Sequence, residues 1–221
     1  MERSIRVKGK GKISVKPDTI RLNIEAEGLF PEYGETVKKS AEETEKVRVT
    51  IEKAGLNPKE LKTVHFGIDS EYESYRDERD NWKRRFMGYK YRHAMNIKFP
   101  NDNDILGKVL YQLSKCDVAV EFSINHTVKD TETVKNQLLS KAVEDSKAKA
   151  EVLAKAAEVM LGEIQSIDYS WGEIEIYSEP MDKMALGCAD MVMEASASYD
   201  VNIEADDIDV QDTVTIVWSI Q

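Results

Sequence analysis

The apolar residues of this chain recur with two different periods, and the segments that carry each period alternate along the sequence. Between Ile5 and Val15 every second residue is apolar or small, and the residues between them are mostly Lys or Arg. Because side chains alternate between the two faces of a strand, this pattern predicts a half-exposed β-strand with one cationic face. Between Pro31 and Ala54 the spacing changes to three and four residues, which indicates an amphipathic helix. Switching between the two periods is typical of an α+β protein.

The same signals predict the remaining elements. We expect further strands over 20–26, 61–72, 88–99, 118–128 and 164–176, two closing strands between 199 and 220, and helices over 105–113 and 131–160. The order ββαβ, then βαβαββ, predicts mixed, largely antiparallel sheets with helices packed on one face. We expect a single domain, 1–221, of two intimately packed lobes, approximately 1–73 and 86–221, joined by a charged loop at 74–85.

The longest predicted helix begins after Asp130, a good N-cap residue. Its apolar stripe follows steps of three and four. We predict that this stripe packs on a sheet or on another helix, and its members are Val134, Leu138, Ala142, Asp145, Ala148, Val152, Ala156 and Val159.

Composition excludes several classes of protein. The 221 residues include 41 acidic and 31 basic residues, a net charge of −10, which argues against a general nucleic-acid binder. No apolar run approaches the roughly 20 residues of a membrane-spanning helix, and the N-terminus lacks the apolar core of a signal peptide. We therefore expect a cytoplasmic protein, or a periplasmic or exported one if a leader has been removed. Two cysteines cannot build a disulfide-dense scaffold or a four-Cys zinc site.

Motifs for catalysis or cofactor binding are absent from the sequence. The segment 7–14 begins like a dinucleotide-binding loop, but Ser14 replaces the third glycine and a strand continues where a helix should open. His65, His93 and His126 lie in separate strand-like segments without ligand spacing. We therefore predict no catalytic residues, no cofactor and a non-enzymatic protein.

Two unusual segments remain. Arg and Lys residues surround Trp82 within 76–86, a mixture that suits either single-stranded nucleic acid or a protein contact. The interleaved acidic residues favour a solvated connecting loop or a protein-contact loop, and we predict no nucleic-acid partner. The segment 181–193 is rich in Met and Cys, and its candidate ligands for a soft metal such as Cu(I) are Met184, Cys188, Met191 and Met193. The alternative is a flexible segment that covers a groove or a neighbouring subunit.

Charge is distributed unevenly between the two ends. The first sixteen residues are strongly basic, and the last twenty-two contain six Asp or Glu and no Lys or Arg. The two ends either lie side by side in one sheet or pair between subunits. We take as interface candidates Arg6, Lys8, Lys10, Lys12, Asp206, Asp207, Asp209 and Trp82.

The order of these signals resembles the SIMPL-domain proteins. The resemblance spans nearly the whole chain. It rests on I-R-V-K-G-K-G-K-I-S-V-K-P-D at 5–18, G-L-N-P-K-E-L-K-T at 55–63, G-Y-K-Y-R-H-A-M-N-I at 88–97, I-L-G-K-V-L at 105–110, A-V-E-D-S-K-A-K-A-E-V-L-A at 142–154, L-G-E-I at 161–164 and the closing strand. Near the end, Ala205-Asp206-Asp207-Ile208 replaces the more usual Pro-Gly-Glu-Ile turn.

The resemblance implies an interaction protein. Bacterial SIMPL proteins are mostly exported, with roles proposed in oxidative-stress tolerance, and some are immunogenic envelope proteins that form ring-like or hollow homo-oligomers. An animal member is an adaptor for a receptor-linked kinase. We therefore expect a homo-oligomeric scaffold or stress-related interaction module. Its expected partner is a second copy of itself, and another protein is a candidate partner. The alternative is a module that binds a soft metal or a small molecule through 181–193.

Overall fold

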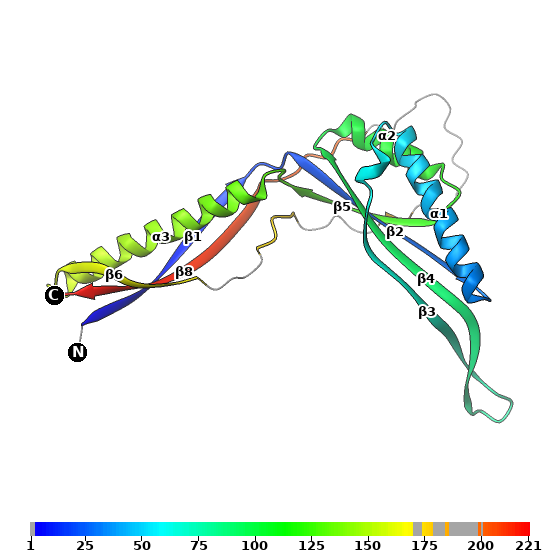
Figure 1. The fold of residues 1–221 in the computed structure, drawn as a ribbon, viewed down its shortest axis with the longest axis horizontal. Helices are drawn as coiled ribbons and strands as arrows, with labels where there is room; N and C mark the ends of the chain where they lie inside the picture. Colours follow the sequence, from blue (N-terminus) through cyan, green and yellow to red (C-terminus); the bar gives the residue numbers. More distant parts are fainter. Residues whose placement is uncertain (1–2, 170–173, 179–183, 186–198, 200) are drawn as a thin grey trace. The chain divides into compact units, whose positions relative to one another are not determined.

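The computed structural model describes residues 3–169, 174–178, 184–185, 199 and 201–221 (Figure 1). The elements in chain order are β1 (Ser4–Val15), β2 (Thr19–Phe30), α1 (Tyr33–Lys53), a short 3-10 helix (Pro58–Glu60), β3 (Lys62–Arg76), β4 (Trp82–Pro100), α2 (Asn103–Ser114), β5 (Val120–Thr127), α3 (Thr131–Ala156), β6 (Leu161–Asp168), β7 (Met184–Ala185) and β8 (Ile208–Ile220). Antiparallel sheets with helices confirm the predicted α+β class.

The chain forms two compact units whose boundaries differ from the predicted sub-lobes 1–73 and 86–221. The terminal unit contains Met1–Asp18, Thr127–Ser178 and Ala205–Gln221, and the central unit contains Thr19–His126 and Glu179–Glu204. The difference arises because β1 pairs with β8, at the opposite end of the chain, and not with β2.

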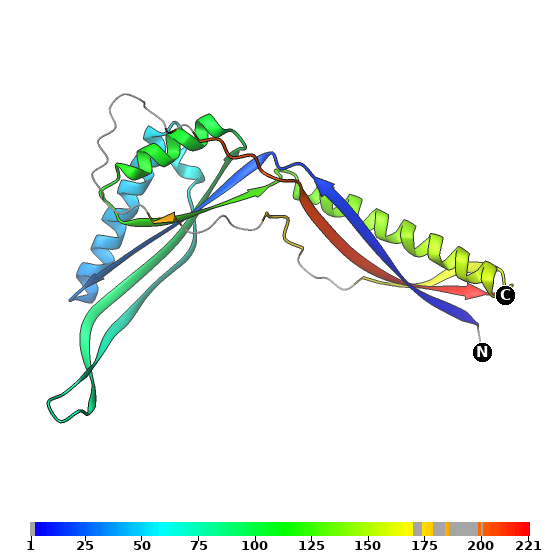
Figure 2. The ribbon, with the colours of Figure 1, turned by 180° about the vertical axis from the view of Figure 1, so that it is seen from behind.

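In the terminal unit, α3 packs along a sheet of order β1-β8-β6 (Figure 2). Two glycines of β1 make this close packing possible. A Cβ atom added to Gly9 would lie 2.0 Å from the carbonyl oxygen of Ala142, and one added to Gly11 would lie 2.1 Å from that of Leu138. The helix backbone therefore rests directly on the strand, at a distance that no other residue type allows.

The buried stripe of α3 differs from the predicted one after Ala142. The buried residues recur at every fourth position, and they are Val134, Leu138, Ala142, Ser146, Ala150 and Ala154. Val152, which we predicted to be buried, is 68% exposed. The small residues, and not the largest, face the sheet because the glycines of β1 leave room only for a close backbone approach. Asp130 caps the helix as predicted, accepting a hydrogen bond from the Thr133 backbone N–H at 3.0 Å.

In the central unit, the strand order is β3-β4-β2-β5-β7, and α1 and α2 cover one face of the sheet (Figure 1). Alternate residues of β2, among them Ile20, Leu22 and Ile24, are fully buried beneath the helices. On the helix side, Val47 and Ile51 of α1 are also fully buried. Each such side chain contributes about 1.5–3 kcal/mol through removal from water. The three- and four-residue spacing over 31–54 predicts that Val37 lies on the buried face of α1, and this is wrong, since Val37 is exposed.

Three other predicted elements have different bounds. The charged loop 74–85 is largely strand, because β3 and β4 continue through it and leave only a short turn. The predicted strand 164–176 begins at Leu161 and ends at Asp168. Of the two closing strands, the described residues contain only β8, because 201–207 form no strand.

Candidate functional site

The distal part of the β3–β4 hairpin has no third strand beside it. β4 pairs with β3 from Trp82 onward, but β2 pairs only with its second part, from Tyr89 to Pro100. Residues 71–88 therefore form a two-stranded ribbon that extends beyond the rest of the sheet (Figure 1). An isolated two-stranded ribbon is marginally stable in water. This ribbon therefore depends on its own side chains or on a partner.

Aromatic and cationic side chains line the ribbon in contact with one another. The Arg76 guanidinium lies 5.0 Å from the centre of the Trp82 ring, and that of Arg84 lies 4.8 Å from Tyr72. Tyr72 also meets Phe86 edge to face, with ring centres 5.5 Å apart. The rings stay accessible, and Trp82 is 68% exposed. Such cation–π contacts contribute about 0.5–1 kcal/mol each at exposed sites, and they hold large apolar surfaces in place without covering them.

Three ion pairs join basic and acidic side chains of the ribbon. Ion pairs join Arg76 to Asp80 at 2.6 Å, Lys83 to Asp77 at 3.0 Å, and Arg85 to Glu73. Asp77 also organises the turn, since its carboxylate accepts backbone hydrogen bonds from Asn81 and Arg79, and these bonds, with Lys83, lower its pKa. Opposite charges this close cancel much of each other's field, and the absence of a nucleic-acid partner stays a prediction.

The outer edge of β3 has no hydrogen-bonding partner among the described residues. β3 is 15 residues long and pairs on one side only, with β4. Its exposed apolar side chains include Val64, Phe66 and Tyr75. A long, exposed edge strand with apolar side chains is a template for pairing with another chain.

The outer edge of β1 is different, because polar side chains of α3 bond to it. The Lys10 backbone N–H donates to the Asp145 carboxylate at 2.6 Å. The Lys12 carbonyl accepts from Lys141 at 3.5 Å, and the Lys8 carbonyl accepts from Lys149 at 3.4 Å. The pKa of Asp145 is lowered, mainly by its hydrogen bond from Lys149 and then by the one from Lys10.

The structure brings the basic and acidic ends into one sheet, the first of the two predicted arrangements. Arg6, Lys8, Lys10 and Lys12 are exposed on β1, and their cross-strand partners on β8 are Val217, Thr215, Thr213 and Gln211. Asp209 lies opposite Ser14, whereas Asp206 and Asp207 precede β8. No ion pair of the described residues joins β1 to β8. Trp82 lies in the central unit, on the ribbon.

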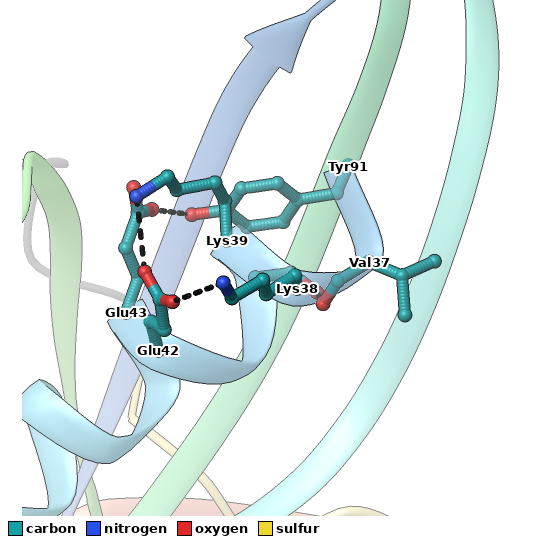
Figure 3. A network of polar contacts seen from close by, with 7 residues as sticks. Val37, Lys38, Lys39, Glu42, Glu43 and Tyr91 are labelled. Atoms are coloured by element: carbon teal, nitrogen blue, oxygen red, sulfur yellow. Dashed lines mark hydrogen bonds and ion pairs between the residues drawn. The ribbon is translucent and has the colours of Figure 1, made fainter. Parts of the chain in front are cut away.

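A polar network at the junction of α1 and β4 was not predicted. The Tyr91 hydroxyl donates to the carboxylate of Glu43, and Glu42 beside it pairs with Lys39 at 3.0 Å and Lys38 at 3.9 Å (Figure 3). Burial raises the pKa of Tyr91, and the hydrogen bond to Glu43 raises it further. The only sequence signal was the position of Tyr91 on the apolar side of its strand. The network fixes how α1 docks on the sheet.

His93 occupies the next buried position of β4. Its Nδ1 lies 2.9 Å from the Thr44 hydroxyl and its Nε2 lies 2.8 Å from the Thr63 hydroxyl. Burial lowers its pKa, and the nearby Arg48 lowers it further. Both ring nitrogens are satisfied, as the sequence interpretation of a structural histidine expects.

The other sequence candidates are placed as follows. Cys188, Met191 and Met193 lie outside the described residues, and of Met184 only the backbone, in β7, is described. Within 3–169 and the other described segments, no three His, Cys, Asp or Glu side chains are grouped to hold a metal ion. None of the helices in the described part of the chain has the length and apolar character to cross a membrane.

Comparison with known proteins identifies the family. Residues 5–218 match the family model described as SIMPL, protein of unknown function (DUF541). Two relatives are named 26 kDa periplasmic immunogenic protein, one from Brucella melitensis biotype 1 and one from Brucella abortus. Each is 26% identical to this chain over 219 residues, which cover 98% of the chain and 84% of the relative. With nearly its whole length matched, the chain belongs to the SIMPL family.

Proposed function

We propose that this protein is a non-enzymatic interaction module that self-associates by pairing β3 with β3 of a second copy. One observation carries the proposal: the 15-residue outer edge of β3 has no partner among the described residues and exposes apolar side chains. Antiparallel pairing of identical strands is self-complementary and creates a two-fold interface. Larger assemblies then need a second contact, which we assign to the exposed rings of the ribbon around Trp82.

The relatives' names guide the remaining parts of the proposal. Because both are called periplasmic, we propose a periplasmic location for this chain as well, and the predicted cytoplasmic location has no support. A role in oxidative-stress tolerance stays a prediction from the family. The absence of catalysis is also a proposal, and a turnover abolished by one carboxylate or histidine substitution would contradict it.

The test is the mass in solution of wild type and of a variant whose edge is blocked. In the variant, Val64→Lys and Tyr75→Lys place two charges on β3, and lysine on an edge strand opposes edge-to-edge pairing. The matched control, Val49→Lys with Val152→Lys, changes two exposed apolar residues on helices.

We expect light scattering to give a discrete assembly for wild type and the control, and 25.1 kDa for the edge variant. Backbone pairing is insensitive to salt, so the assembly should persist at high ionic strength. A monomeric wild type, or an edge variant that assembles normally, would overturn the proposal. Assembly lost on adding salt would point instead to contacts between charged strands.

A further inference from the structure

The four cations of β1 form a straight row on the outer face of the terminal unit's sheet. Arg6, Lys8, Lys10 and Lys12 occupy every second position, so their side chains leave the same face. Two residues of an extended strand span about 6.8 Å, and the row therefore covers about 20 Å. All four cations are exposed, and none forms an ion pair among the described residues.

The strand beside this row supplies neutral polar groups. Thr215, Thr213 and Gln211 of β8 lie opposite Lys8, Lys10 and Lys12. Their hydroxyl and amide groups donate hydrogen bonds to an anion without competing with it for the lysines. The contrast with the ribbon is marked, because there each of three cations is paired with an acidic neighbour.

A cavity of about 550 Å³ lies at one end of the row. It is lined by polar groups of three elements: Lys12 and Ser14 from β1, Lys141 from α3, and Asp209 and Gln211 from β8. Two ammonium groups outnumber the single carboxylate, Asp209, among the described lining residues. Asp145, one turn after Lys141 on α3, is bound to the Lys10 backbone and to Lys149. The cavity therefore favours an anionic group.

We propose that this face binds an extended acidic peptide segment of a partner protein, in which Asp or Glu recurs at every second residue. An extended peptide repeats its side chains on one face with the same spacing of about 6.8 Å as the row on β1, so each carboxylate meets one cation. The carboxylate at the end of the segment enters the cavity between Lys12 and Lys141. The surface belongs to the terminal unit and does not include β3. A result that contradicts self-association through β3 would therefore leave the proposed peptide site untouched.

The test uses two labelled peptides of identical composition, one with alternating Glu and Ser and one with all Glu in a single block. Fluorescence anisotropy on the full-length protein should show about tenfold tighter binding of the alternating peptide, the gain expected when several exposed ion pairs form together. Lys8→Gln, Lys10→Gln and Lys12→Gln combined should remove that preference, and Lys141→Gln should weaken binding of the alternating peptide alone.

The matched control removes the same charge from the central unit, through Lys46→Gln, Lys53→Gln and Lys59→Gln, all at exposed positions. It should bind as wild type does, and thermal unfolding should show that both triple variants are folded. Equal binding of the two peptides, or equal losses in the two triple variants, would overturn the proposal. Inorganic polyphosphate that binds more tightly than the alternating peptide would also overturn it, since the face would then be a general anion patch.

Discussion

β1 and β3 are both long edge strands, of 12 and 15 residues, but their outer edges differ in whether they form hydrogen bonds. The edge of β1 is completed by α3, whose side chains bond to the backbone of Lys8, Lys10 and Lys12. The edge of β3 has no such partner in the described residues. In the terminal unit a helix therefore covers the β1 edge, whereas in the central unit the β3 edge is a template open to a second chain.

The difference follows from the geometry of a helix beside a strand. Four residues of a helix rise about 6.0 Å, and two residues of a strand span about 6.8 Å. Lys141, Asp145 and Lys149 are four residues apart, so their side chains reach alternate residues of β1 nearly in register. The glycines of β1 bring the helix close enough for this contact. A helix thus takes the place of a neighbouring strand.

The largest expected effect comes from closing the space under α3. In Gly11→Ala, the new Cβ meets the Leu138 carbonyl oxygen at 2.1 Å and the Ala142 nitrogen at 3.0 Å, so the helix must move. We expect a loss of about 3 kcal/mol or more in the free energy of unfolding, measured with urea. Gly34→Ala is the control, because nothing lies within 4 Å of its new Cβ; it should be neutral or stabilising by up to about 1 kcal/mol. Similar stability of Gly11→Ala and wild type would contradict the close packing.

Asp145→Ala should open the edge of β1. The Lys10 amide loses its acceptor, and we expect its hydrogen exchange to accelerate by roughly tenfold, as for one lost hydrogen bond. The pKa of Asp145 is lowered in the fold, so its contribution is present above the ordinary value near 3.8 and is lost as the pH falls through the folded pKa. Wild type in acid should therefore resemble the variant. An unchanged exchange rate would show that the carboxylate does not protect this edge.

His93 makes the stability of the central unit depend on pH. Its pKa is lowered by burial, so its contribution is complete above the ordinary value of 6.5 and decreases as the pH falls toward the folded pKa. Wild type should lose stability between about pH 7 and about pH 5. His93→Gln should lose less stability over that range. Part of the pH dependence should remain, because burial also lowers the pKa of His126. Urea unfolding at both pH values measures this change in stability. An equal change in wild type and His93→Gln would show that His93 does not cause the pH dependence.

Trp82→Ala should have the smallest effect on stability. Trp82 is 68% exposed and contacts the side chain of Arg76, so we expect a change of less than about 0.5 kcal/mol. Under the proposed function, the same substitution should weaken the larger assembly while leaving the β3 pairing intact. Light scattering separates these results, and unchanged assembly would remove the ribbon rings from the proposal.

The sequence periods predicted most elements because strands and helices in contact with a core repeat their burial every two or about 3.6 residues. The periods gave wrong predictions where small residues allow close packing and where a strand has no covered face. The stripe of α3 was wrong after Ala142 because small residues face the sheet there. Ser146 meets Gly9 of β1, and hydrophobicity does not reveal that contact. The ribbon was taken for a loop because neither of its faces is covered, so its charges and rings do not alternate as in a half-buried strand.

The candidate site was predicted in part. The charge asymmetry left two arrangements open, and the pairing of β1 with β8 matches the first of them. Trp82 is exposed on the ribbon, and its role at an interface stays a prediction. The unpaired edge of β3 is a property of the sheet order, which a single sequence does not reveal. The bonds from Tyr91 to Glu43 and from His93 to Thr44 depend on how α1 docks, and were likewise inaccessible.

The pairing of β1 with β8 also sets the order in which the chain folds during synthesis. The central unit is inserted between β1 and α3, and the insertion points are tied together: the Asp18 N–H donates to the Thr127 carbonyl at 3.2 Å, and the Lys129 N–H donates to the Asp18 carboxylate at 2.8 Å. β1 emerges from the ribosome before the central unit, but its partner β8 is made after that unit. Strands β2 to β5 of the central sheet are made earlier than β8, so we expect them to fold first. Their folding would bring the two halves of the terminal unit together and shorten the loop that β1 must close.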